Sequence, residues 1–184
     1  MSPLIIILII VVVIGLLFIA TYNKLTKRRI LVKEGWSGIG TFLQQRNDLI
    51  PNLVETVKGY ALHESKTLTE VVKWRARGDA ATTPVEKMEA GNGMNKALVD
   101  FFAVAEQYPD LKANANFLSM QADLKEMETN INQSRRYYNG AVRDYNQAVA
   151  VFPNNLIAGM FGFGSEPFVQ EEAAARELPN VSFS

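Results

Sequence analysis

The chain has 184 residues, which suits one small domain with or without a membrane anchor and does not suit a multi-domain enzyme. It contains no cysteine and a single histidine, which excludes disulfide frameworks, thiol nucleophiles, iron–sulfur clusters and Cys/His zinc sites. Basic and acidic residues balance at 19 each, so no overall field favours nucleic acid, and we expect no nucleic-acid partner.

The first element expected is a membrane anchor. From Leu4 to Ala20 the side chains are apolar, interrupted only by Gly15. At about 1.5 Å per residue, this run nearly crosses a hydrocarbon core of about 30 Å. A cleaved signal peptide is the main alternative, but no Lys or Arg precedes the run and residues 20–23 lack a small-x-small cleavage site. We therefore predict an uncleaved transmembrane helix within residues 1–23, with the lipid bilayer as a partner.

A basic collar follows the apolar run and precedes the first acidic residue, Glu34; it consists of Lys24, Lys27, Arg28, Arg29 and Lys33. Basic residues on one side of a span favour the cytoplasmic side. The sequence therefore predicts a single-pass protein with its N-terminus outside and the bulk of the chain in the cytoplasm.

Beyond the collar the apolar residues recur at steps of three and four, which predicts amphipathic helices. Trp36, Leu43, Ile50, Val57 and Val71 lie at multiples of seven on either side of Pro51. Two interpretations remain open: a near-continuous helix kinked at Pro51, or a new helix capped by Asp48 with Pro51 in its first turn. In either case Gly78 is expected as the C′ residue that ends the helix.

The next helix has a specific start signal, because Thr83-Pro84-Val85-Glu86 is a capping box with proline at the first helical position. We expect this helix to end near Gln107, although Gly91 and Gly93 weaken its middle.

The last long helix is expected from Pro109 or Asp110 to Phe152. Its core positions recur every seven residues, which predicts coiled-coil-like packing; they are Phe117, Leu124, Ile131, Tyr138, Tyr145 and Phe152. Glu128 and Arg135 lie on or beside this stripe, so we predict an ion pair between them. Asn139 and Asn146 follow the two tyrosines and are expected to bond across helices, with a partner-binding surface as the alternative.

After Pro153 the glycines are expected to break the helix, yet the segment is too apolar to be left in water. We predict that residues 153–164 dock on the bundle, on a second copy of the chain or on lipid, and that residues 165–184 form a mobile acidic tail. The predicted domains are thus 1–23 (anchor), 24–152 (bundle) and 153–184 (docking segment and tail).

Catalytic chemistry finds little support in the sequence. A zincin would need a second histidine four residues after His63, where Thr67 stands, and a di-iron bundle would need two Glu-x-x-His pairs. The carboxylates Asp48, Glu55, Glu64 and Glu106 are expected to cap helices or pair with cations. We therefore predict no catalytic, cofactor-binding or metal-binding residues and no cofactor.

Several segments together resemble the bacterial LemA family, in the family's order and over most of the chain from Tyr22-Asn23 to Phe163. They are residues 46–54 (RNDLIPNLV), 57–64 (VKGYALHE), 106–114 (EQYPDLKAN), 135–139 (RRYYN), Tyr145-Asn146 and Phe152-Pro153. The resemblance implies a bacterial inner-membrane protein with an external N-terminus and a cytoplasmic antiparallel, up-and-down four-helix bundle, and a kinship with magnetosome-membrane proteins. It supplies no catalytic residue.

The function we expect is therefore non-enzymatic: a membrane-anchored helical scaffold that binds other membrane proteins or self-assembles into a homo-oligomer. The alternatives are a regulatory or signalling subunit of a membrane protease or other membrane enzyme, a membrane-shaping protein, and a hydrolase that uses carboxylates.

Overall fold

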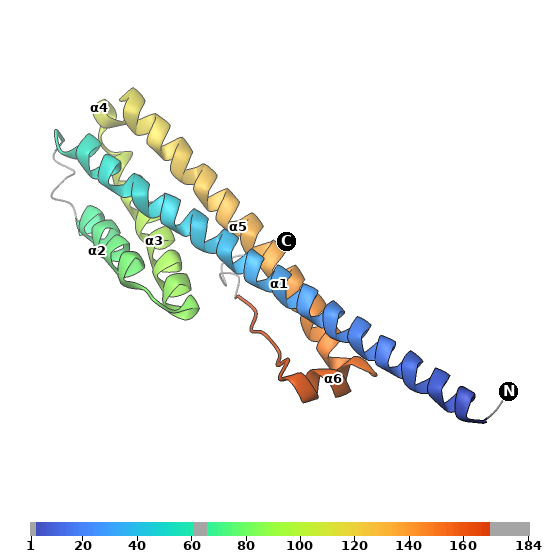
Figure 1. The fold of residues 1–184 in the computed structure, drawn as a ribbon. Helices are drawn as coiled ribbons and strands as arrows, with labels where there is room; N and C mark the ends of the chain where they lie inside the picture. Colours follow the sequence, from blue (N-terminus) through green and yellow to red (C-terminus); the bar gives the residue numbers. More distant parts are fainter. Residues whose placement is uncertain (1–2, 61–65, 170–184) are drawn as a thin grey trace, which may run out of the picture. The chain divides into compact units, whose positions relative to one another are not determined.

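The computed structural model describes residues 3–60 and 66–169, and in this part of the chain every regular element is a helix (Figure 1). The helices are α1 (Pro3–Val57), α2 (Lys66–Ala80), α3 (Pro84–Ala105), α4 (Pro109–Lys112), α5 (Ala115–Ala150) and α6 (Asn154–Phe161). The prediction of an all-α fold is confirmed. The described chain divides into two compact units, a membrane-proximal unit of residues 3–36 with 136–169 and a bundle unit within residues 37–135.

Helix α1 resolves the alternatives at Pro51. The helix continues through this proline to Val57, although a proline in a helix interior removes one backbone hydrogen bond. The series of apolar residues from Trp36 to Val71 does not lie in a single helix, however. The chain turns after Val57, whose carbonyl accepts the N–H of Tyr60 at 3.0 Å, and Val71 belongs to α2. Val57 and Val71 are nevertheless both buried in the same core, which each helix enters with one side.

Gly78 does not end its helix as expected, since α2 continues to Ala80. Its role is to allow close packing: a Cβ atom at Gly78 would collide with the side-chain amide of Asn47 on α1. Gly93 of α3 acts in the same way, because a Cβ atom there would overlap the ring of Trp74 on α2. The glycines that weaken these helices intrinsically are thus what lets α2 and α3 approach their neighbours.

The start of α3 is the capping box that the sequence predicts. The Thr83 hydroxyl accepts the N–H of Glu86 at 3.3 Å, and the Glu86 carboxylate accepts the N–H of Thr83 at 3.0 Å. The backbone N–H groups of Thr82 and Thr83 that bond this carboxylate lower the pKa of Glu86 below its usual value. The cap fixes the connection between α2 and α3, which pack against each other.

The bundle unit is an antiparallel, up-and-down arrangement of four helical segments, from α1, α2, α3 and α5. The direction follows from the contacts between the first and last segments: Gly38 approaches Ser134, whereas Arg46 pairs with Glu128. Its core is built from Ile50, Leu53, Val57, Leu68, Val71, Met94, Ala97, Leu98, Phe101, Ala105, Leu111, Phe117, Met120 and Leu124. Apolar residues at helical spacing in α1, α3 and α5 therefore pack together in one core.

The predicted helix from residue 110 to Phe152 is interrupted near its start and ends early. Its first turn is the separate helix α4, and α5 begins after Asn114, whose side-chain oxygen accepts the N–H groups of Asn116 and Phe117 at 2.9 and 3.1 Å. Asn114 thus acts as an N-cap that the sequence analysis missed. At the other end, Phe152 lies beyond α5 and is 77% exposed, so the seven-residue stripe ends at Tyr145.

Candidate membrane-proximal site

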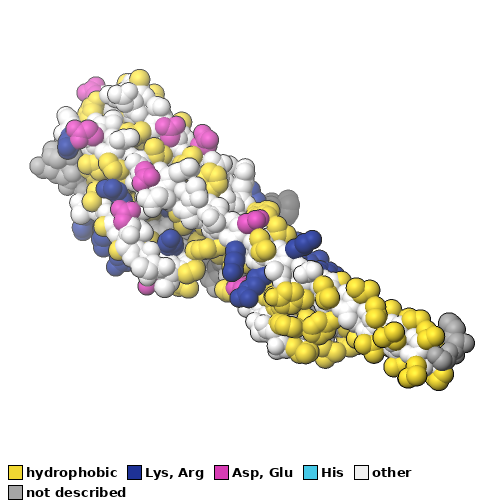
Figure 2. Space-filling view, viewed as in Figure 1, with side chains coloured by type: hydrophobic (Ala, Val, Ile, Leu, Met, Phe, Trp, Pro, Cys, Tyr) yellow, Lys and Arg dark blue, Asp and Glu magenta, His cyan; other side chains and the backbone are white. Residues whose placement is uncertain are grey.

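The first part of α1 is an apolar helix whose side chains are mostly exposed among the described residues. Its large side chains from Leu4 to Ile19, apart from Phe18, are 45–76% exposed, and yellow side chains cover this end of the molecule (Figure 2). By length and composition this helix can cross a membrane. Such a surface is stable only in an apolar environment.

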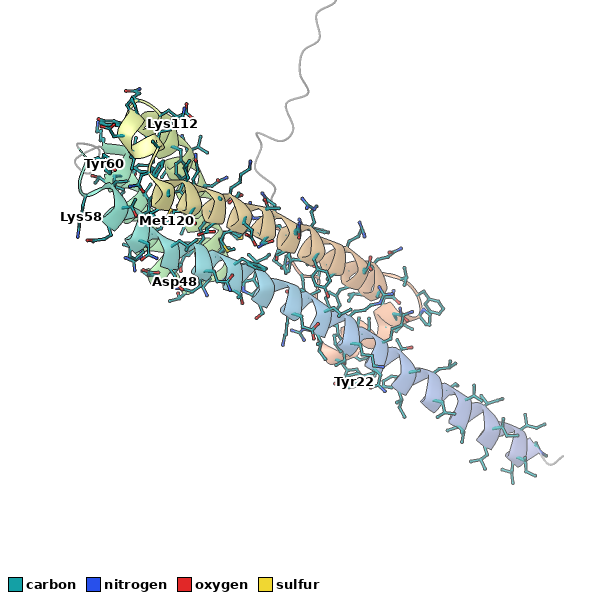
Figure 3. All side chains as sticks on the ribbon, turned by 90° about the horizontal axis from the view of Figure 1, so that it is seen from above. Tyr22, Asp48, Lys58, Tyr60, Lys112 and Met120 are labelled. Atoms are coloured by element: carbon teal, nitrogen blue, oxygen red, sulfur yellow. The ribbon has the colours of Figure 1, made fainter. Side chains whose placement is uncertain are left out.

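Helix α6 packs beside the last turns of this apolar stretch, within the membrane-proximal unit. The ring of Phe161 meets those of Phe18 and Tyr22 edge-on, at centroid distances of 5.6 and 5.0 Å, and Phe163 meets Tyr22 at 5.6 Å. Tyr22 is labelled on α1 in Figure 3. Ile157 is also buried in this unit. The apolar segment forms a helix despite its glycines and packs on α1 of its own chain.

The opposite side of α6 carries large apolar side chains without protein cover. Leu156 is 59% exposed and Met160 71%, and Phe152, just before the helix, is 77% exposed. In Figure 2 yellow side chains cover the anchor and part of the adjoining surface, with white atoms among them. Helix α6 is therefore packed on one side only.

Two asparagines of α5 hold the chain that follows α6 in an extended form. Asn146 donates to the carbonyl of Glu166 at 2.9 Å and accepts its N–H at 2.8 Å, and Asn139 does the same for Val169 at 2.9 and 3.0 Å. The spacing is matched, because seven helical residues and three extended residues each span about 10 Å. We call residues 165–169 the strap and the two asparagines the clamp.

The clamp corrects two predictions. Asn139 and Asn146 bond to the backbone of the strap and not to another helix of the bundle. Residues 165–169, expected at the start of a mobile tail, are held in place, while residues 170–184 lie outside the described residues. The sequence signal that was missed is the heptad spacing of two asparagines, which suits a strand running along the helix.

Tyrosine hydroxyls add to the strap site. Tyr138 donates to the carbonyl of Pro167 at 2.9 Å, and Arg29 lies 3.7 Å from the carboxylate of Glu166. Burial, and then the negative charge of Glu166, raises the pKa of Tyr138. Burial also raises the pKa of Tyr145, whose buried hydroxyl has no hydrogen-bond partner among the described residues. Both phenols therefore lose their protons at a higher pH than a free tyrosine does.

The basic collar divides into two sets. Arg28 donates to the carbonyl of Asp144 and Arg29 faces Glu166, so both arginines bind the protein. Lys24, Lys27 and Lys33 are exposed. The arginines of the collar thus join α1 to α5 and to the strap. The lysines of the collar are exposed on the surface.

A buried polar cluster lies in the bundle unit. Arg46 is only 1% exposed and donates to the Glu128 carboxylate and to the Gly91 carbonyl, both at 2.8 Å. Arg135 donates to the side-chain oxygen of Asn92 at 2.8 Å. The predicted pairing of Glu128 with Arg135 is therefore wrong: Glu128 binds an arginine of another helix, which a pattern within one helix cannot reveal.

Those of the carboxylates weighed for catalysis that the structure describes each have their own polar partner. Asp48 accepts from Gln44 at 2.9 Å, Glu55 pairs with Lys58 at 2.6 Å, and Glu106 lies 3.8 Å from Lys112. His63 and Glu64 lie outside the described residues. Within the residues described, no group of three or more His, Cys, Asp or Glu side chains could hold a metal ion.

The clamp and the bundle lie in the part of the chain that comparison with known proteins covers. The model of the LemA family matches residues 35–183. The chain belongs to the LemA family. Two relatives from Paramagnetospirillum magneticum, magnetosome proteins MamQ 1 and MamQ 2, are each 27% identical over 187 residues, covering 85% of this chain and 69% of theirs. Protein LemA of Metamycoplasma hominis is 25% identical, covering 77% and 65%.

The LemA-family match leaves out the N-terminal apolar stretch and the whole basic collar, which precede residue 35. It includes α6, the strap and both asparagines of the clamp. The family resemblance therefore concerns the bundle and its C-terminal attachment, while the anchor rests on the chemistry of its own residues.

Proposed function

We propose that this LemA-family chain is a non-enzymatic helical scaffold, anchored by α1 in the bacterial inner membrane, whose bundle binds other copies of itself or neighbouring membrane proteins. One observation carries the proposal: in the described part of the chain, the large side chains of α1 from Leu4 to Ile19, apart from Phe18, are 45–76% exposed, although the same helix extends directly into a folded unit. Removing such a surface from water requires a bilayer.

The orientation proposed places the bundle in the cytoplasm and the N-terminus outside. Its support is the set of exposed lysines Lys24, Lys27 and Lys33, which follow the apolar stretch and suit the anionic cytoplasmic surface. The absence of cysteine from the chain allows a direct test. In intact cells a membrane-impermeant maleimide is expected to label Ser2→Cys, and Asp123→Cys only after lysis; the reverse pattern would overturn the orientation.

A scaffold role is supported by apolar side chains left on the surface of the bundle. Val85 is 77% exposed, Val99 63% and Leu118 48%, whereas Asp48, Glu55 and Glu106 each have their own polar partner. Exposed apolar residues of this kind suit contacts with other proteins.

The test is to extract the full-length protein from its native membrane into polymer nanodiscs and to measure particle masses by mass photometry. We expect particles holding several copies, or copies with other membrane proteins. A particle that is strictly monomeric and copurifies with nothing would contradict the scaffold. Recovery of one membrane enzyme at fixed stoichiometry would instead favour the alternative of a regulatory subunit.

A further inference from the structure

We propose that α6 is a lipid-binding helix, which lies in the membrane interface with the outward side chains of Leu156, Met160 and Phe152 inserted among the lipids beside the anchor. This inference rests on the proposed insertion of α1 in a bilayer. It adds a second contact between the same unit and the membrane, made by a segment more than a hundred residues further along the chain.

The arrangement of side chains around α6 supports this contact. Leu156 and Met160 are four residues apart and so lie on one side of the helix. Ile157 and Ala158 are buried against the unit, and the exposed Asn155 lies on a third side. The helix thus has a protein side, an apolar outward side and a polar outward side, which is the pattern of a helix lying in an interface.

The depth of α6 is set by its aromatic contacts with α1. Phe161 touches Phe18, inside the apolar stretch, and Tyr22, just after it. Tyrosine near the end of a span is typical of the boundary between acyl chains and headgroups. Lys24 and Lys27 come within two turns of Tyr22 and are exposed. The rings therefore place α6 at the level where the apolar core gives way to the headgroups.

Lipid is a better occupant than a protein for the outward side of α6. The exposed side chains of α6 adjoin the exposed surface of the anchor, and that surface must already be covered by acyl chains. A protein partner would have to displace those lipids locally. The exposed lysines next to Tyr22 complement anionic headgroups, which suit the same location.

The experiment uses the full-length chain in nanodiscs that contain anionic lipid, with single cysteines carrying an environment-sensitive fluorophore. Met160→Cys reports the proposed lipid side, and Asn155→Cys is the matched control on the polar side of the same helix. Gly15→Cys, where the structure has open space around the helix, reports insertion of the anchor. Lipids bearing a nitroxide quencher at a shallow or a deep position report contact with lipid and its depth.

We expect the label at residue 160 to shift to the blue and to lose most of its fluorescence to the shallow quencher, while the label at residue 155 shows the smaller effect. Equal, weak quenching at residues 155 and 160 would overturn the inference. A blue shift at residue 160 without quenching would also overturn it, since the cover would then be protein. Strong deep quenching at residue 15 in the same samples shows that the anchor is inserted, so its absence would identify a failure of the proposed anchoring instead.

Discussion

Arg46 is a buried side chain that joins three helices of the bundle unit by hydrogen bonds. Its guanidinium joins α1 to α5 through Glu128 and to α3 through the carbonyl of Gly91. Arg46→Met removes the guanidinium donor from the Gly91 carbonyl and from the half-buried Glu128 carboxylate, which keeps a hydrogen bond from Asn132 at 3.1 Å. We expect a loss of about 3 kcal/mol in the free energy of unfolding. Urea unfolding followed by circular dichroism measures it.

Two controls separate this effect from general loss of charge. Arg143→Ala removes an arginine whose side chain is 72% exposed, and the expected cost is below about 1 kcal/mol. The double variant Arg46→Met/Glu128→Met replaces both charges by apolar groups and is expected to recover much of the stability. A single Arg46 variant as stable as the Arg143 variant would show that the cluster contributes little.

Tyr138 gives the membrane-proximal unit a dependence on alkaline pH. Its pKa is raised by burial and by Glu166, so the folded chain keeps a proton that the unfolded chain loses near pH 10. The stabilisation is complete below the unfolded pKa and is lost as pH rises through the higher folded pKa.

Comparing unfolding at neutral pH and above pH 10 tests this prediction. Tyr138→Phe is expected to cost about 1 kcal/mol at neutral pH through the lost bond to Pro167, and to show a shallower decline at alkaline pH than the parent. Tyr137→Phe is the neighbouring control, since Tyr137 is 54% exposed. Identical alkaline declines in all three chains would refute the assignment.

Among the elements, the strap depends on a clamp that recognises backbone alone. The two asparagines make four hydrogen bonds to the main chain of Glu166 and Val169, and each contributes about 1 kcal/mol. Replacing both asparagines by alanine is expected to release residues 165–169 from α5.

Chymotrypsin provides the readout for strap release, because Phe168 lies within the strap and is followed by Val169. Cleavage after Phe168 is expected to accelerate in Asn139→Ala/Asn146→Ala and to stay at the parent rate in Asn155→Ala, which changes an exposed asparagine of α6. If the double variant is cut no faster than the parent, the clamp does not hold the strap.

The elements also show what a sequence can predict. The capping box at Thr83 and the stripe from Phe117 to Tyr145 are confirmed because their signals are local and follow helical periodicity. The break at Asn114 was missed because apolar residues at helical spacing, Leu111 and Phe117, lie on both sides of it, so the sequence pattern looks like one helix. The helical continuation through Gly78 was missed because a glycine needed for close approach to Asn47 looks identical in sequence to one that ends a helix.

The candidate site was less predictable than the elements. Hydrophobicity identified the anchor and the apolar character of α6, but the partner of each polar side chain lies far away in the sequence. Arg46 and Glu128 are 82 residues apart, and Asn139 and Val169 are 30 apart. Such pairings are decided by the packing of helices and not by the pattern within any one of them.

At the scale of the whole molecule, the two units are expected to respond differently to loss of the anchor. A chain beginning at Lys24 lacks Phe18 and Tyr22, and so lacks the rings that hold α6; each aromatic pair contributes about 1 kcal/mol. The bundle core draws its residues from positions 50–124. We therefore expect α6 to loosen while the bundle unit keeps its stability.

Trp74 can report on the bundle unit alone once Trp36 is changed to phenylalanine. In that background, deletion of residues 1–23 is expected to leave the Trp74 unfolding midpoint unchanged, to move the protein from the membrane to the soluble fraction, and to speed proteolysis at α6. Phe18→Ala/Tyr22→Ala in the full-length chain is the matched control, with the same loosening of α6 but retention in the membrane. A lower Trp74 midpoint in the deleted chain would mean that the anchor stabilises the bundle as well, and that the two units fold as one.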